Sequence, residues 1–265
     1  MTELAMRDAS VHSAPTWSVV VRLLLWFATA YTIVILVHEG AHAVVARMAG
    51  LHATMFHFWV DIDRNNSMWQ RAAFGTAGPA SSLMLGLGAW LAYRTARGSA
   101  SAVPLLFLAA CGVSNCFGNL MSTAFVGDFS NVALWLGLPM GVRYALSALG
   151  LVIVACVLFA AGYELRRWPL AGWSRIATAG LGVVVPVALG TMLVVVINQP
   201  VAIPSFVAAR FGEAAFWVFA VAGAARATPA VVQNESIDGL LWSDAVIALV
   251  VLAIVRLLVT GVPLP

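Results

Sequence analysis

An apolar run near the start of the chain limits what the chain can fold into. From Trp17 to Val37 the only charged residue is Arg22. About 20 apolar residues are enough for one helix to cross the hydrocarbon layer of a bilayer. Over the whole chain, 62% of the residues are hydrophobic and 9% are charged, whereas soluble domains have about 25% charged residues. We therefore expect an integral, multi-pass membrane protein.

Apolar stretches recur along the chain and predict about six spans, at residues 17–48, 69–93, 102–125, 143–162, 176–197 and 240–262. The predicted fold class is all-α, a polytopic transmembrane helix bundle. After the first span, alternating and aromatic residues in Met55–Ile62 precede the turn-forming Asp63–Asn66. This pattern predicts a short β-hairpin. The region 206–232 leaves two interpretations open, either a re-entrant or surface helix or a seventh span.

A metal-binding motif, His38-Glu39-Gly40-Ala41-His42, follows directly on the first apolar run. Histidines four positions apart lie on one face of a helix, so both imidazoles can bind one ion. The intervening glutamate can reach a water molecule beside that ion. An ionisable group inside a membrane costs a few kcal/mol or more and persists mainly for function. The spacing predicts a Zn²⁺ site with His38 and His42 as ligands and Glu39 as the catalytic base.

A catalytic zinc ion usually has three protein ligands and one open position, so a third ligand is needed. Asp128 is favoured, because the third span should return to the membrane face at which the first span ends. Asn115 and Asn119 lie one helical turn apart before it. They either hydrogen-bond between helices, for roughly 0.6 kcal/mol each, or hold the substrate backbone. The other acidic candidates are Asp61, Asp63, Glu164, Glu213, Glu235, Asp238 and Asp244.

Three motifs in sequence order resemble the site-2 protease family of intramembrane zinc metalloproteases. After the histidine motif, Gly78-Pro79-Ala80-Ser81-Ser82 is similar to the family's Gly-Pro-x-x-Asn. Asn119-Leu120-Met121, leading to Asp128, is similar to the family's Asn-x-x-Pro and Leu-Asp-Gly segments. The chain departs from the pattern at Ser82, which replaces the asparagine, at the missing proline, and at Phe129, which follows the aspartate. The resemblance covers about residues 17–131.

The resemblance implies a zinc metalloendopeptidase that cleaves a membrane-embedded protein or peptide substrate in the lipid bilayer. It also implies that Asp128 is the third zinc ligand, and we expect Ser82, Asn115 and Asn119 to bind substrate. The chain would then divide into a polar segment 1–16, a three-span catalytic core 17–131, and accessory spans and loops 132–265. We expect it in a bacterial-type cytoplasmic membrane. An exposed edge of the hairpin could pair with an unwound substrate.

Other functions and both orientations stay open at this point. The same His/Glu/Asp cluster would suit a transporter or ion-coupled protein, a non-peptidase membrane zinc hydrolase, or a catalytically inactive scaffold. With the N-terminus inside, eight arginines fall on the inner face of the membrane and six on the outer face. This bias predicts that the zinc site lies toward the outer face. The family resemblance implies a site nearer the cytosol. The net charge of +3 is small and dispersed, so we expect no nucleic-acid partner, and the sequence indicates no oligomeric state.

Overall fold

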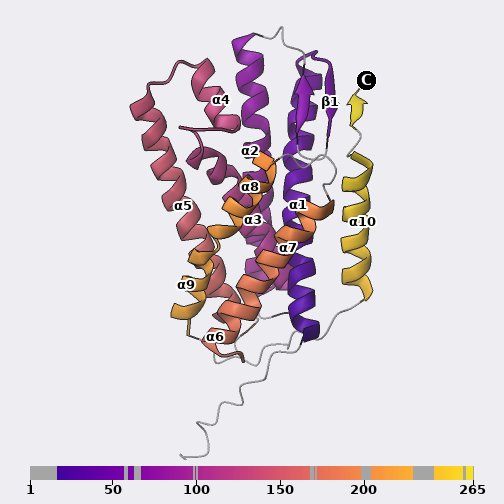
Figure 1. The fold of residues 1–265 in the computed structure, drawn as a ribbon, viewed down its shortest axis with the longest axis vertical. Helices are drawn as coiled ribbons and strands as arrows, with labels where there is room; N and C mark the ends of the chain where they lie inside the picture. The colour runs from indigo at the N-terminus through magenta and orange to yellow at the C-terminus, as the bar shows by residue number, and fades with distance from the viewer. Residues whose placement is uncertain are drawn as a thin grey trace, which may run out of the picture.

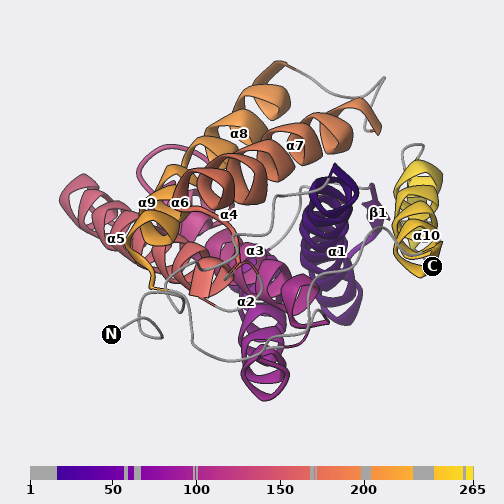
Figure 2. The same cartoon turned by 90° about the horizontal axis from the view of Figure 1, so that it is seen from below.

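The computed structural model describes residues 17–56, 59–62, 67–97, 99, 101–167, 170, 172–197, 204–228, 242–258 and 261–264. These form a helix bundle with one small sheet (Figure 1; seen from below in Figure 2). The helices, in chain order, are α1 (Trp17–Met48), α2 (Met68–Thr95), α3 (Ala102–Met121), α4 (Asp128–Trp135), α5 (Met140–Arg167), α6 (Arg175–Ala177), the π-helix η1 (Thr178–Val184), α7 (Val185–Ile197), α8 (Pro204–Ala215), α9 (Val218–Arg226) and α10 (Trp242–Leu258).

Four helical segments within the described residues are long and apolar enough to cross a membrane. They are α1, α3, α5 and the continuous α6–η1–α7 segment. The chain is therefore a multi-pass integral membrane protein. The 28-residue α2 and the 17-residue α10 fall on the other two predicted spans, and six spans remain a prediction. For the region 206–232, a re-entrant or surface helix and a seventh span were both open. Two short helices, α8 and α9, of 12 and 9 residues, cover most of its described part.

A three-stranded antiparallel sheet lies beside the end of α1 and includes the predicted hairpin. Strands β1 (Ala53–Met55) and β2 (Val60–Ile62) pair directly. The hairpin prediction is therefore confirmed for these strands, whereas Asp63–Asn66 falls outside the described residues. The third strand, β3 (Val262–Leu264), pairs with the other side of β1 and makes the order β2-β1-β3. One edge of the hairpin is thus covered by the chain's own C-terminal strand.

Local signals in the sequence set where α1 ends and α2 begins. Gly50, with a φ of 73°, follows α1 in the left-handed conformation that glycine adopts without strain. At the start of α2, the Ser67 hydroxyl accepts from the Gln70 backbone N–H, and the Gln70 side chain accepts from the Ser67 N–H. Gln70 also donates to the carbonyl oxygen of Ala49 at 3.0 Å. This bond ties the start of α2 to the end of α1.

The main apolar core lies at the end of the bundle opposite α4 (Figure 1). There the Phe27 ring meets the rings of Phe107 and Trp217 edge-on. Association of helices in lipid depends on close packing of small residues rather than on removal of apolar surface from water. Accordingly, α2 and α3 cross where a Cβ added to Gly112 would lie 2.8 Å from the Gly86 Cα. This close crossing fixes α2 against the bundle and brings its preceding turns to the metal-binding motif.

Candidate metal centre

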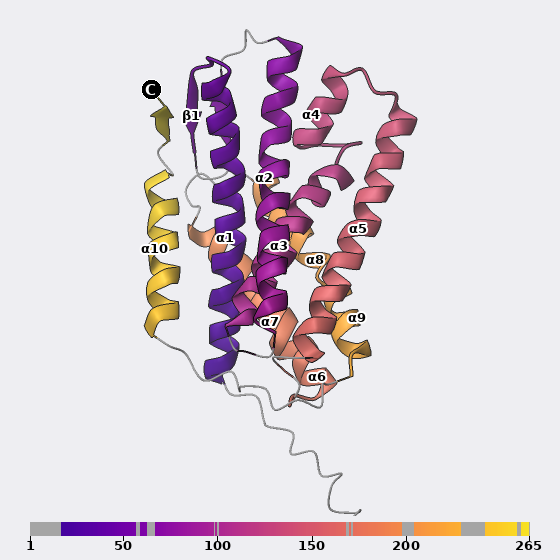
Figure 3. The ribbon, with the colours of Figure 1, turned by 180° about the vertical axis from the view of Figure 1, so that it is seen from behind.

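Two helices bring together the three predicted metal ligands. His38 and His42 project from α1 and are buried, and Asp128 is the first residue of α4. Helix α4 lies between one end of α2 and one end of α5 (Figure 3). The His38 Nε2 atom lies 2.9 Å from Asp128 Oδ2 and 3.1 Å from His42 Nε2. The His42 Nε2 atom lies 3.5 Å from the same carboxylate oxygen.

The spacing and chemistry of these three atoms fit a bound metal ion. A tetrahedral zinc ion with ligand bonds of about 2.0–2.1 Å holds its ligand atoms about 3.3 Å apart. The three separations, 2.9, 3.1 and 3.5 Å, lie around that value. Two imidazole nitrogens and one carboxylate oxygen also match the ligand types that catalytic zinc sites use. The group His38, His42 and Asp128 can therefore hold a metal.

The other ring nitrogens of the two histidines are hydrogen-bonded in a way that suits metal binding. His42 Nδ1 lies 2.6 Å from the carbonyl oxygen of Phe74, which can only accept, so His42 donates from Nδ1. His38 Nδ1 lies 3.1 Å from the hydroxyl oxygen of Ser82. A metal-binding histidine usually donates its second N–H to an oxygen, which leaves the first nitrogen unprotonated. Both Nε2 atoms can then offer a lone pair to one ion.

Gly78 lets the backbone of α2 approach the centre closely. A Cβ placed on this residue would overlap the Nε2 atom of His42 and lie 2.5 Å from the Nε2 atom of His38. Any larger residue would therefore occupy the space beside the two ligand atoms. Gly78, the glycine of the Gly78-Pro79 pair in the sequence, therefore lies directly against the metal-binding motif.

Asp128 is positioned by the turn that precedes α4. Gly127 has a φ of 106°, a conformation that favours glycine. The Asp128 backbone N–H donates to Asn119 Oδ1 at 3.3 Å, and Asn119 Nδ2 donates to the Asn115 carbonyl oxygen at 3.1 Å. Burial raises the pKa of the Asp128 carboxyl, but the neighbouring imidazoles of His38 and His42 lower it by more. Its net pKa lies below the ordinary range, so the carboxylate is anionic at neutral pH.

A buried arginine, which the sequence analysis did not single out, also holds this turn. Arg143 of α5 donates from Nε to the Thr123 carbonyl oxygen and from Nη2 to the Ser130 hydroxyl, both at 3.1 Å. Ser147 of the same helix accepts from the Ala124 N–H at 3.0 Å. Arg143 lies at the start of an apolar span, where a buried charge is costly. An arginine at the start of an apolar span was therefore the signal in the sequence that could have indicated a structural role for Arg143.

A cavity of about 420 Å³ lies next to the turn that precedes α4. Its α3 wall includes Ser114, Asn115 and Asn119, and Gly127 lies at the end next to Asp128. Within the described part of the chain, Ser114 Oγ and Asn115 Oδ1 are buried without a hydrogen-bond partner. The lining also includes the aromatic side chains of Phe216 and Trp217. The cavity thus offers both hydrogen-bonding groups and apolar rings.

Polar residues from α1 and α8 line or approach the rim of this cavity. The Tyr31 hydroxyl donates to Glu213, while Arg210 donates to the Tyr31 oxygen at 2.8 Å and pairs with Glu213 at 2.9 Å. Glu39 lies between the two histidines on α1 and is 8% exposed. Its side chain is therefore largely shielded from bulk solvent.

The other acidic candidates lie away from the three ligand atoms. Asp61 is exposed on β2, opposite Thr54. Glu164 accepts from Arg97 at 3.0 Å and from Tyr93 at 2.8 Å. Glu164 is buried, so these two hydrogen bonds occupy its carboxylate within the bundle. Asp244 pairs with Arg22 at 2.6 Å. Asp63, Glu235 and Asp238 lie outside the described residues.

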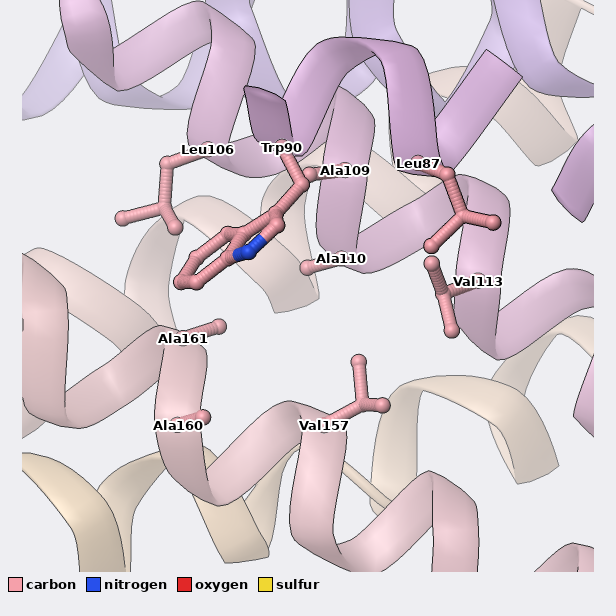
Figure 4. Close-up of a pocket in the computed structure, with 9 residues that line it drawn as sticks. All are labelled: Leu87, Trp90, Leu106, Ala109, Ala110, Val113, Val157, Ala160 and Ala161. Atoms are coloured by element: carbon pink, nitrogen blue, oxygen red, sulfur yellow. The ribbon is translucent and has the colours of Figure 1, made fainter. Parts of the chain in front are cut away.

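A second cavity, between α2, α3 and α5, has a different character. It measures about 220 Å³, and its lining is apolar, with Leu87, Trp90 and Val157 projecting into it (Figure 4). The lining contains no carboxylate, imidazole or thiol, so this cavity offers no ligand for a metal.

Comparisons of the chain with protein-family models, curated proteins and solved structures find no match. The description that stands is therefore a helical membrane protein with a buried His38/His42/Asp128 cluster that can bind a metal.

Proposed function

We propose that this chain is an intramembrane zinc metalloprotease, similar to the site-2 protease family, that hydrolyses a peptide bond of a membrane-embedded protein or peptide. The observation that carries the proposal is the convergence of His38 Nε2, His42 Nε2 and Asp128 Oδ2 within 3.5 Å of one another. Glu39 on the same helical turn completes the hydrolase motif.

The proposed chemistry assigns a separate task to each group. His38, His42 and Asp128 hold the zinc ion, which when bound supplies a Lewis acid for the scissile carbonyl and for water. Glu39 accepts the proton of the attacking water and passes it to the leaving amine. Its burial beside the ligands supports this role, because proton transfer is efficient when the carboxylate is held close and shielded from bulk solvent.

The cavity next to the turn that precedes α4 supports a peptide as the substrate. A helical substrate conceals its carbonyl groups in its own hydrogen bonds, so it must unwind before cleavage. The unwound backbone then needs new partners inside the membrane. The unpartnered Ser114 Oγ and Asn115 Oδ1 on the α3 wall offer them, and Phe216 and Trp217 offer contacts for apolar side chains. Asn119 belongs to the same wall, although its side chain also holds the Asp128 turn.

Removal of metal tests the proposal in purified protein. We expect proteoliposomes containing the protein to cleave single-span reporter peptides within their apolar segment, as identified by mass spectrometry of the products. A chelator should abolish cleavage and added Zn²⁺ should restore it, whereas added Ca²⁺ should not, because calcium prefers oxygen ligands.

A metal-coupled transporter is the second candidate, favoured by additional ion pairs between helices, such as Arg22–Asp244. The same proteoliposomes distinguish the two functions. Uptake of radioactive zinc into sealed vesicles, without cleavage of any reporter peptide, would contradict the protease function and support the transporter function.

A further inference from the structure

Ser82 lies behind the metal centre rather than in the substrate cavity. It is fully buried, with 0% exposure, one turn along α2 from Gly78. It is not among the residues that line the 420 Å³ cavity. Helix α3 packs closely against the backbone of this turn, because a Cβ on Gly112 would lie 2.8 Å from the Ser82 carbonyl oxygen. In this structure the Ser82 hydroxyl is therefore not accessible to a substrate backbone.

The hydrogen bonds of Ser82 allow the imidazole of His38 to donate. A serine hydroxyl has one proton to give and two lone pairs to accept with. Ser82 Oγ donates to the Gly78 carbonyl oxygen at 3.1 Å. It can then accept at its contact with His38 Nδ1, which is also 3.1 Å long. A neutral His38 that donates from Nδ1 has its lone pair on Nε2, the atom that a metal ion would bind.

We propose that Ser82 is a positioning residue that holds His38 in the tautomer and ring orientation required for metal binding, an inference that rests on the proposed function. His42 receives the same support from the Phe74 backbone carbonyl, which no substitution can remove. A substitution of Ser82 can therefore change the orientation of one metal ligand, His38. This role differs from the substrate contact expected from the sequence.

Neighbouring Ser81 provides a matched control. Its hydroxyl also donates to the Gly78 carbonyl oxygen, at 2.8 Å, and reaches the Val37 carbonyl oxygen at 3.3 Å. No hydrogen bond with a histidine is among its contacts in the described part of the chain. Ser81→Ala therefore removes a similar local bond from the same turn of α2 without removing the acceptor for His38.

Metal affinity measured by competition with a chelator tests the inference in the full-length protein. Ser82→Ala should bind Zn²⁺ about 10–100-fold more weakly than wild type, the usual effect of losing an outer partner of a metal-binding histidine. Ser82→Cys, which fills the same space with a weak acceptor, should lose affinity as well. Ser81→Ala should stay within about threefold of wild type. The visible spectrum of bound Co²⁺, which reports ligand geometry, should change in both Ser82 variants and not in Ser81→Ala.

The outcomes separate this inference from the proposed function. Equal affinity of wild type and both Ser82 variants would overturn the role of Ser82 and leave the metal centre intact. Equal losses in Ser81→Ala and Ser82→Ala would also overturn it, because the cause would then be a general disturbance of α2. A wild-type protein that binds neither Zn²⁺ nor Co²⁺ would overturn both proposals together.

Discussion

A methyl group at position 78 is expected to close the metal centre. In Gly78→Ala, the new Cβ overlaps His42 Nε2 and lies 2.5 Å from His38 Nε2. Either α2 must move away or both imidazoles must turn from their ligand positions. Overpacking of this kind costs about 1–3 kcal/mol or more. If this cost applies to the metal-bound protein and not to the metal-free protein, Zn²⁺ affinity should fall by on the order of 100-fold. Chelator competition measures this affinity.

Gly88→Ala is the matched control for this prediction. Gly88 belongs to the same helix, and a Cβ there would meet no atom within 4 Å. Alanine is favoured over glycine in a helix interior by about 1 kcal/mol in water, so we expect this variant to fold and to bind Zn²⁺ as wild type does. Unchanged metal affinity in Gly78→Ala would show that the imidazoles do not bind where the structure places them.

Replacement of Glu39 by glutamine should stop hydrolysis without removing the metal. Glutamine keeps the size of the side chain but cannot accept the proton of the attacking water. General acid–base catalysis contributes roughly 10²–10⁴-fold to a rate, so the turnover of a reporter peptide should fall by at least about 100-fold. Zinc content should match wild type, because Glu39 is not among the three candidate ligands.

Asp61→Asn makes the same change from carboxylate to amide on the exposed surface of β2 and should retain full turnover. The proposed role of Glu39 is wrong if Glu39→Gln cleaves the reporter as fast as wild type does. Loss of zinc together with loss of activity would instead give Glu39 a part in holding the metal.

The features that the sequence predicted well depend on local or topological rules. The run before His38 is long enough to span a bilayer, and Gly50 ends the helix that carries the motif. The position of Asp128 followed from the alternation of spans across the membrane, and the 2.9 Å separation from His38 agrees with it. These inferences needed only the period of a helix and the thickness of a bilayer.

The features that the sequence did not predict depend on contacts between distant segments. Strand β3 is three residues long and contains Pro263, which cannot donate a hydrogen bond, so only its pairing with β1 makes it a strand. In the region 206–232, the turn at Phe216–Trp217 separates two helices within a stretch of high hydrophobicity. The π-helix η1 precedes Pro186, whose missing N–H disturbs the regular bonding of the helix.

The sequence showed that serine replaces the family's asparagine at position 82, but it did not show which residue the serine hydroxyl would contact. Serine and asparagine can both contact a substrate, and the sequence does not say which helix lies behind α2. Only the position of His38 Nδ1, at 3.1 Å from the hydroxyl, directs this residue toward the metal ligand. Arg143 was similarly interpretable only once its bonds to the Asp128 turn were visible.

Elemental analysis of purified protein tests the central claim most directly. Wild type should contain one zinc ion per chain, held by His38, His42 and Asp128. His38→Ala and Asp128→Ala should lose it, because the free energy of a structural zinc site, about 10–16 kcal/mol over four ligands, implies roughly 3 kcal/mol per ligand. Asp61→Ala, whose side chain is exposed on β2, should retain it. A wild-type protein without metal, or an Asp128→Ala protein with a full equivalent of zinc, would contradict the account.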